Sequence, residues 1–79
     1  FFMLTLDMLD ELHVLMLFNP ANGQEGIKVH HSAEPATIDA CRRLHARGLV
    51  TQEDGGYLTP LGIQAVEHAV ALLTILTPA

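Results

Sequence analysis

The side chains best suited to chemistry in this 79-residue sequence are basic, and all of them fall within residues 27–48. This segment carries four cations against two carboxylates, a net charge of +2, whereas the rest of the chain carries the other seven acids and no lysine or arginine. The four residues are Lys28, Arg42, Arg43 and Arg47. Cations gathered in one segment are typical of surfaces that contact phosphate groups, so the pattern indicates a nucleic-acid contact.

A helix over residues 35–47 would present most of these cations. Pro35 suits the first turn of a helix, and Gly48 suits the position just after its end. Apolar side chains recur on one face, so Arg43 would lie on the opposite face, where it could reach a guanine edge while the other cations hold phosphates. The candidate DNA-binding residues are Lys28, Ala36, Thr37, Arg42, Arg43 and Arg47.

A β-hairpin is expected after this helix, in the stretch GLVTQEDGGYLTPLG, residues 48–62. Strands near residues 49–52 and 57–59 flank an Asp-Gly pair, which is the strongest short turn signal. The tip of the turn carries Glu53 and Asp54, whose charges repel phosphate groups. A hairpin that grips DNA would carry lysine or arginine there.

The charge balance leaves two functions open. Nine acids against four bases give the chain a net charge of −5, which opposes strong non-specific DNA binding. Asp39 precedes Arg43 by one helical turn, a spacing typical of an ordinary surface ion pair. The first hypothesis is a DNA-binding protein of the small transcription-regulator type. The alternative is a protein-interaction or dimerisation module that does not bind DNA.

The first helix should begin at Thr5, a suitable cap, and end at Asn19-Pro20. A short second helix is expected over residues 23–31, GQEGIKVHH, because Asn22 and Glu25 resemble a capping box. A strand is the alternative for this segment, because apolar and polar residues alternate in it. In the first helix, Leu6, Leu9, Leu12 and Met16 would face inward, and Asp7, Asp10 and Glu11 would lie mostly on the other side.

The last helix should begin at Thr59-Pro60 and stop at Pro78. The expected order is helix, helix, helix, hairpin, helix, in a single domain over residues 1–79. That order predicts a mainly α fold with one β-hairpin, a winged helix-turn-helix, with residues 35–47 in the position of the recognition helix.

Both terminal helices carry more apolar surface than one buried stripe needs, which predicts a homodimer built from them. A domain this small gains stability from such burial. A compact monomer in which these helices pack only on each other is the alternative. The candidate interface residues are Val14, Leu17, Phe18, Leu72, Ile75 and Leu76.

Other chemistries have little support in the sequence. A zinc site needs three or four converging ligands, and the nearest approach is Cys41 with His45, so neither a metal nor a cofactor is expected. No nucleophile–base pair or phosphate loop stands out, so we expect no catalytic residue and no enzyme. A pH or metal sensor using His30, His31 and His45 is a weaker hypothesis. No signal peptide or membrane span is apparent, and a cytoplasmic protein is expected.

The runs QEGIKVHH, RLHARGLV, DGGYLTPLG and EHAVALLTIL together resemble a family of short uncharacterised bacterial proteins that are often labelled as candidate DNA-binding proteins. The resemblance covers roughly residues 5–76 and implies a bacterial, cytosolic protein. More broadly, GLV…DGGYLTPLG looks like the wing region of bacterial winged-helix repressors. That likeness implies that the terminal helices form a dimer interface; it does not identify a small-molecule effector.

Overall fold

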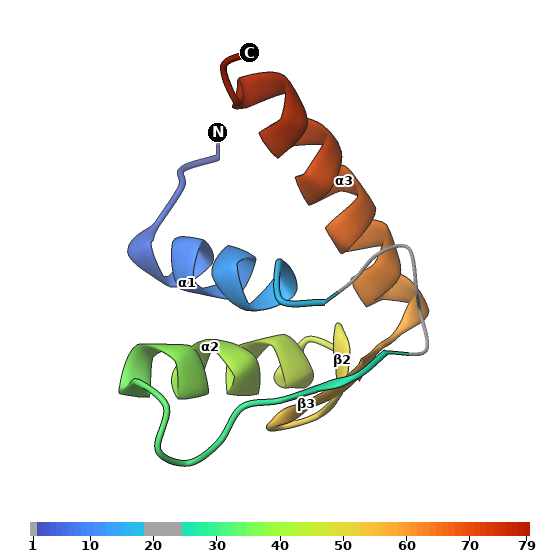
Figure 1. The fold of residues 1–79 in the computed structure, drawn as a ribbon. Helices are drawn as coiled ribbons and strands as arrows, with labels where there is room; N and C mark the ends of the chain where they lie inside the picture. The colour runs from blue at the N-terminus through green and yellow to red at the C-terminus, as the bar shows by residue number, and fades with distance from the viewer. Residues whose placement is uncertain (1, 19–24) are drawn as a thin grey trace.

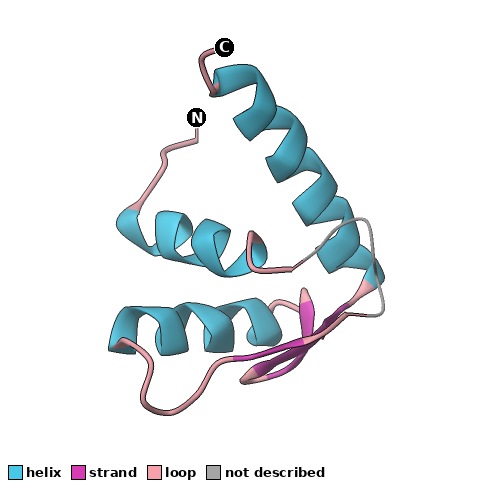
Figure 2. Ribbon diagram, in the orientation of Figure 1, coloured by secondary structure: helices cyan, strands magenta, loops and turns pink. Residues whose placement is uncertain are grey.

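The computed structural model describes residues 2–18 and 25–79 and has a mainly helical fold with a small antiparallel sheet (Figures 1 and 2). The elements follow the order α1, β1, α2, β2, β3, α3. Their bounds are α1 Leu6–Leu15, β1 Ile27–Lys28, α2 Pro35–Ala46, β2 Val50–Gln52, β3 Gly55–Leu58 and α3 Pro60–Leu76. The expected mainly α fold with one β-hairpin is therefore confirmed.

The core lies where α1, α2 and the sheet meet. Figure 1 shows α1 and α2 side by side, the sheet at one end of this pair, and α3 leaving the hairpin to extend past the end of α1. The first half of α3 closes the core, and its second half extends beyond the other elements. The buried apolar side chains are Val14, Leu15, Phe18, Ala40, Cys41, Leu44, Val50 and Val66.

Helix α1 is capped as expected but presents a different face to the core. The hydroxyl oxygen of Thr5 accepts a hydrogen bond from the backbone N–H of Met8 at 3.1 Å. The predicted inward face was wrong, because Leu6 is 79% exposed and Glu11 is buried. The buried face follows Glu11, Val14, Leu15 and Phe18, since a carboxylate at Glu11 finds cationic partners on α2.

The predicted second helix was wrong, and the strand that was its alternative is correct. Residues 27–28 form β1, which pairs antiparallel with β3 and gives the sheet order β1-β3-β2. The last residues of the segment form a turn, in which the N–H of Ala33 donates to the carbonyl of His30 at 2.9 Å. Residues 23 and 24 of the predicted helix lie outside the described residues. The capping signal of Asn22 and Glu25 did not decide the structure, because residues 27–28 pair with a strand that is distant in the sequence.

The hairpin and both of the later helices follow their sequence signals. The hairpin forms where the Asp-Gly signal predicts it, with Glu53 and Asp54 as the turn, and Gly55 and Gly56 take positive φ angles of 122° and 69° that other residues rarely adopt. The hydroxyl of Thr59 caps α3 by accepting the N–H of Gly62 at 3.0 Å. A side chain at Gly62 would collide with the carbonyl oxygen of Leu49, so glycine lets the first turn of α3 pack against the sheet.

Candidate functional site

Two arginines of α2 are bound to one buried carboxylate of α1, an arrangement that we name the Glu11 clamp after Glu11, Arg43 and Arg47. The Nε–H of Arg43 donates to Oε2 of Glu11 at 2.6 Å, and Nη2 of Arg47 donates to Oε1 of the same carboxylate. Arg43 also contacts Asp7, with Nη2 lying 3.8 Å from Oδ1. The clamp therefore joins α1 to α2 through both oxygens of one carboxylate.

The charges of the Glu11 clamp stabilise one another. Burial by itself raises the pKa of Glu11, but hydrogen bonds and charge from Arg43 and Arg47 outweigh it, so the net shift is downward. The pKa of Arg43 is raised, mainly by its hydrogen bond to Glu11. Glu11 thus stays ionised although its side chain is only 10% exposed.

This arrangement corrects the predicted orientation of two candidate DNA-binding residues. Arg43 was expected to point away from the protein toward a base, and Arg47 toward a phosphate. Both guanidinium groups instead hold Glu11, and the side chain of Arg43 is only 33% exposed. The sequence interpretation missed Glu11, because an acidic residue beside Asp10 was taken as part of a solvated face.

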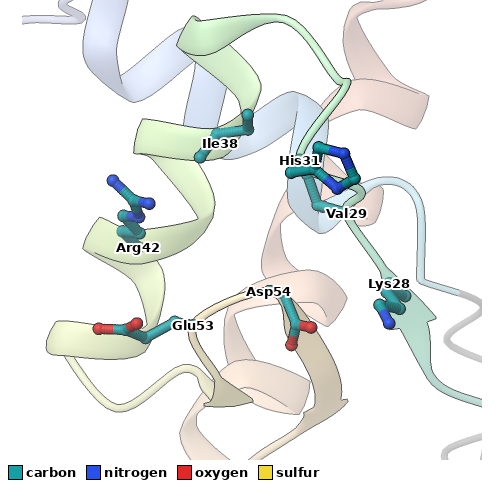
Figure 3. Close-up of a pocket in the computed structure, with 7 residues that line it drawn as sticks. All are labelled: Lys28, Val29, His31, Ile38, Arg42, Glu53 and Asp54. Carbon is teal, nitrogen blue, oxygen red and sulfur yellow. The ribbon is translucent and has the colours of Figure 1, made fainter.

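The other two cations, Lys28 and Arg42, are exposed and line one pocket. The pocket has a volume of about 280 Å³ and lies between β1, α2 and the β2–β3 turn (Figure 3). Of the remaining candidate residues, Ala36 is exposed at the start of α2, and Thr37 is half-buried. We name this cavity the charged pocket; its lining residues are Lys28, Val29, His31, Ile38, Arg42, Glu53 and Asp54.

The charged pocket contains both signs of charge in equal number. Glu53 and Asp54 reach it from the hairpin turn, Glu53 on the side of Arg42 and Asp54 on the side of Lys28. Within residues 2–18 and 25–79, neither Lys28 nor Arg42 forms an ion pair with a carboxylate within 4.0 Å. The four charges therefore remain available to a ligand that enters the pocket.

The residues predicted for a dimer interface separate into two groups. Val14 and Phe18 are 1% and 3% exposed, so they belong to the core of one chain and offer no surface to another. The other four are exposed: Leu17 60%, Leu72 55%, Ile75 80% and Leu76 66%. The two buried residues were misassigned because α1 turns its far end toward the core, where Val66 of α3 also packs.

An apolar groove adjoins these exposed residues. It lies between the end of α1 and the second half of α3, and its lining is mostly aliphatic. The lining residues are Met16, Val70, Leu73, Thr74 and Thr77. The groove residues of α3 and the exposed residues Leu72, Ile75 and Leu76 lie on opposite faces of the same helical turns, so the second half of α3 is apolar on both faces.

Cys41 is fully buried, and burial together with the charge of Asp54 raises the pKa of its thiol. In the part of the chain that the structure describes, no three side chains of His, Cys, Asp or Glu meet closely enough to hold a metal ion. No helix among these residues is long and apolar enough to cross a membrane.

The family of the chain follows from a match over almost its whole length. Residues 2–77 match the family of unknown function DUF5669. The chain belongs to the DUF5669 family. No curated protein and no solved structure matches it. The description of DUF5669 names no activity, so DNA binding and the likeness to winged-helix repressors stay predictions for this DUF5669 protein.

Proposed function

We propose that this protein is a self-associating interaction module that works through the second half of α3. The observation that carries the proposal is the composition and exposure of residues 69–76, AVALLTIL. They contain no charged residue, and Leu72, Ile75 and Leu76 are each more than half exposed. A helix that is apolar on all sides is normally buried, so this one needs a partner.

The exposed area of the chain supports a partner of substantial size. The protein exposes 5737 Å², whereas a compact monomer of its mass exposes about 4,700 Å². The excess, about 1,000 Å², is of the order of the roughly 800 Å² that each partner contributes to a standard interface. The exposed side chains of Phe2, Met3 and Leu4 contribute to this excess together with the second half of α3, and an interface at α3 would cover the part that belongs to α3.

A second copy of the chain is the partner that fits best. The apolar region of α3 carries no charge, so a partner needs no complementary charge, and the same region on another copy meets that requirement. A two-fold dimer would pack the face of α3 that carries Leu72, Ile75 and Leu76 against the same face of the other copy. This interface would use the three residues of α3 that were expected from the sequence, and of the three expected on the α1 side only Leu17 is exposed enough to join it.

We include in this proposal that the fold is related to the winged helix-turn-helix. The sheet order β1-β3-β2 and a helix after the hairpin are consistent with that fold. The place of the helix before α2 is taken by β1 and the turn at His30–Ala33. We infer a reduced winged-helix scaffold in which α2 is held by the Glu11 clamp and α3 provides the contact surface.

DNA binding is the second candidate, and the exposure of Lys28 and Arg42 beside the hairpin favours it. Three features oppose it. Two of the four cations are held by Glu11, the hairpin turn brings Glu53 and Asp54 beside the other two, and the net charge is −5. Since non-specific affinity rests on cations that displace counterions, this surface is a weak phosphate ligand.

One pair of measurements tests the two candidates together. Sedimentation equilibrium should give a dimer for the natural chain and a monomer for Ile75→Glu, because a carboxylate cannot enter an apolar interface without a partner. Gln64→Glu is the matched control: it adds the same charge to an exposed position in the first half of α3 and should stay dimeric. A natural chain that is monomeric at every concentration would reject the self-association proposal.

The DNA arm uses fluorescence anisotropy with a mixed-sequence duplex at low and high salt. We expect no binding in the micromolar range. Micromolar binding that weakens with salt and is lost in Arg42→Gln would instead support the second candidate. The two arms are independent, so a dimer that also binds DNA would be recognised as such.

A further inference from the structure

The chain distributes its few cations between two sites, and only one of them is explained by packing. Arg43 and Arg47 hold the buried carboxylate of Glu11 and so connect α1 to α2. Lys28 and Arg42 come from different elements, lie far apart in the sequence, and line the same charged pocket. In an acidic protein, convergence of the two remaining cations on one cavity points to a ligand.

The hairpin turn that carries both acids of the charged pocket is held in place by the backbone. The N–H of Val29 donates to the carbonyl oxygen of Asp54 at 2.7 Å, which ties the hairpin turn to the end of β1. Asp54 itself is half-buried. Figure 3 shows Arg42 and Glu53 on one side of the pocket and Lys28 and Asp54 on the other. Each side thus offers one positive and one negative group.

This charge pattern selects the ligand. A phosphate or other dianion would be repelled by Glu53 and Asp54, and a simple cation would be repelled by Lys28 and Arg42. A ligand that carries one charge of each sign satisfies both pairs. The aliphatic groups of Val29 and Ile38, both half-buried, provide an apolar part of the pocket lining, away from Glu53 and Asp54 (Figure 3).

The size of the pocket restricts the ligand further. Its volume, about 280 Å³, lies at the lower limit of the roughly 300–1,000 Å³ typical of pockets for drug-sized molecules. A small molecule is therefore indicated. Charges of opposite sign on adjacent groups, next to a short apolar group, are the features of a free α-amino acid.

We propose that the charged pocket binds an aliphatic α-amino acid. The guanidinium of Arg42 binds its carboxylate from one side of the pocket, the carboxylate of Asp54 binds its ammonium from the other side, and its side chain rests on Val29 and Ile38. The pocket contains no residue of α3. This binding site is thus additional to the self-association surface and does not depend on it.

The test is an NMR titration of the full 79-residue chain, labelled with ¹⁵N, using L-leucine at neutral pH. We expect saturable shifts confined to the backbone amides around the charged pocket, with a dissociation constant of about a millimolar, as suits a small ligand in an open site. N-acetyl-L-leucine lacks the ammonium, and L-leucinamide lacks the carboxylate. Each should bind at least about tenfold more weakly, because one pair of charges is left unpaired.

Substitutions within the pocket distinguish a zwitterion site from an anion site. Asp54→Asn and Arg42→Gln should each weaken L-leucine binding about tenfold, the effect of losing one charge-assisted contact. Inorganic phosphate should not bind the natural chain. If the pocket were an anion site, phosphate would bind, and Asp54→Asn would bind it more tightly because one repelling charge is removed. Glu67→Gln is the matched control for Asp54→Asn, since it removes one negative charge from an exposed position outside the pocket and should leave affinity for L-leucine unchanged.

Three outcomes would overturn the proposal. The first is an absence of shifts at a concentration well above a millimolar. The second is equal binding of L-leucine and its two blocked forms, which would show that only the apolar group is recognised. The third is binding of phosphate that competes with L-leucine and grows stronger in Asp54→Asn.

Discussion

Arg43 on α2 donates its Nε–H to the buried carboxylate of Glu11 on α1 across 2.6 Å, and Arg47 donates to the other oxygen of the same group. The partners lie 32 and 36 residues apart in the sequence. Two residues one helical turn apart on α2 thereby fix both the position and the rotation of α1. The arginines that most resembled a DNA-reading pair thus have a structural role within the fold.

Replacing Glu11 with Gln should destabilise the protein by about 1–3 kcal/mol, because both arginines lose a charge-assisted partner and a buried polar group is left. Urea unfolding followed by circular dichroism measures the change. Asp10→Asn is the matched control, since it removes an equal charge from the next position of α1 and should change stability by less than about 0.5 kcal/mol. Equal effects in both variants would mean that net charge, and not the clamp, accounts for the loss.

The contribution of Glu11 should disappear in acid. Its folded pKa is lowered from the ordinary value of 4.5. A lowered folded pKa means that the stabilisation is fully present above the unfolded pKa and is lost as pH falls through the folded value. The difference in unfolding free energy between the natural chain and Glu11→Gln should therefore be constant near neutral pH, begin to shrink near pH 4.5, and vanish below the folded pKa. A difference that grows on acidification would contradict this assignment.

Elements with local signals could be predicted from the sequence. Pro35 and Gly48 mark the ends of α2, the Asp-Gly pair marks the hairpin, and Thr59-Pro60 marks the start of α3. Each signal acts through the backbone conformation of the residue itself or of its immediate neighbours. The structure accordingly places α2, the hairpin and α3 within a few residues of their predicted bounds.

The features that were missed depend on residues distant in the sequence. Residues 27–28 form a strand because they pair with β3, which begins at Gly55 and is therefore distant in the sequence. Glu11 becomes buried because α2 brings two guanidinium groups to it. For the candidate site, the segregation of cations was visible, but the separation into a clamp and a pocket follows from tertiary packing.

Cys41 should behave as an inert buried thiol. It is fully buried, and its pKa is raised by burial and by the negative charge of Asp54, so little reactive thiolate is exposed in the folded protein. Reaction with a thiol reagent near neutral pH should proceed only as fast as the chain opens, and urea should accelerate it to the rate of a free cysteine. Rapid reaction of the folded chain would show that the core around α2 opens easily.

Two glycines at the ends of the hairpin region should respond differently to alanine. Gly48 has a φ angle of 80° with open space around it, so Gly48→Ala should cost about 1 kcal/mol from backbone strain alone. Gly62 lies in the first turn of α3, where alanine has the higher helix propensity and would by itself stabilise the helix by about 1 kcal/mol. Its added methyl group would nevertheless collide with the carbonyl oxygen of Leu49, which is backbone and cannot move aside easily. Gly62→Ala should therefore destabilise the protein more than Gly48→Ala does. Urea unfolding gives the sign directly, and a stabilised Gly62→Ala would mean that α3 does not pack against the sheet as described.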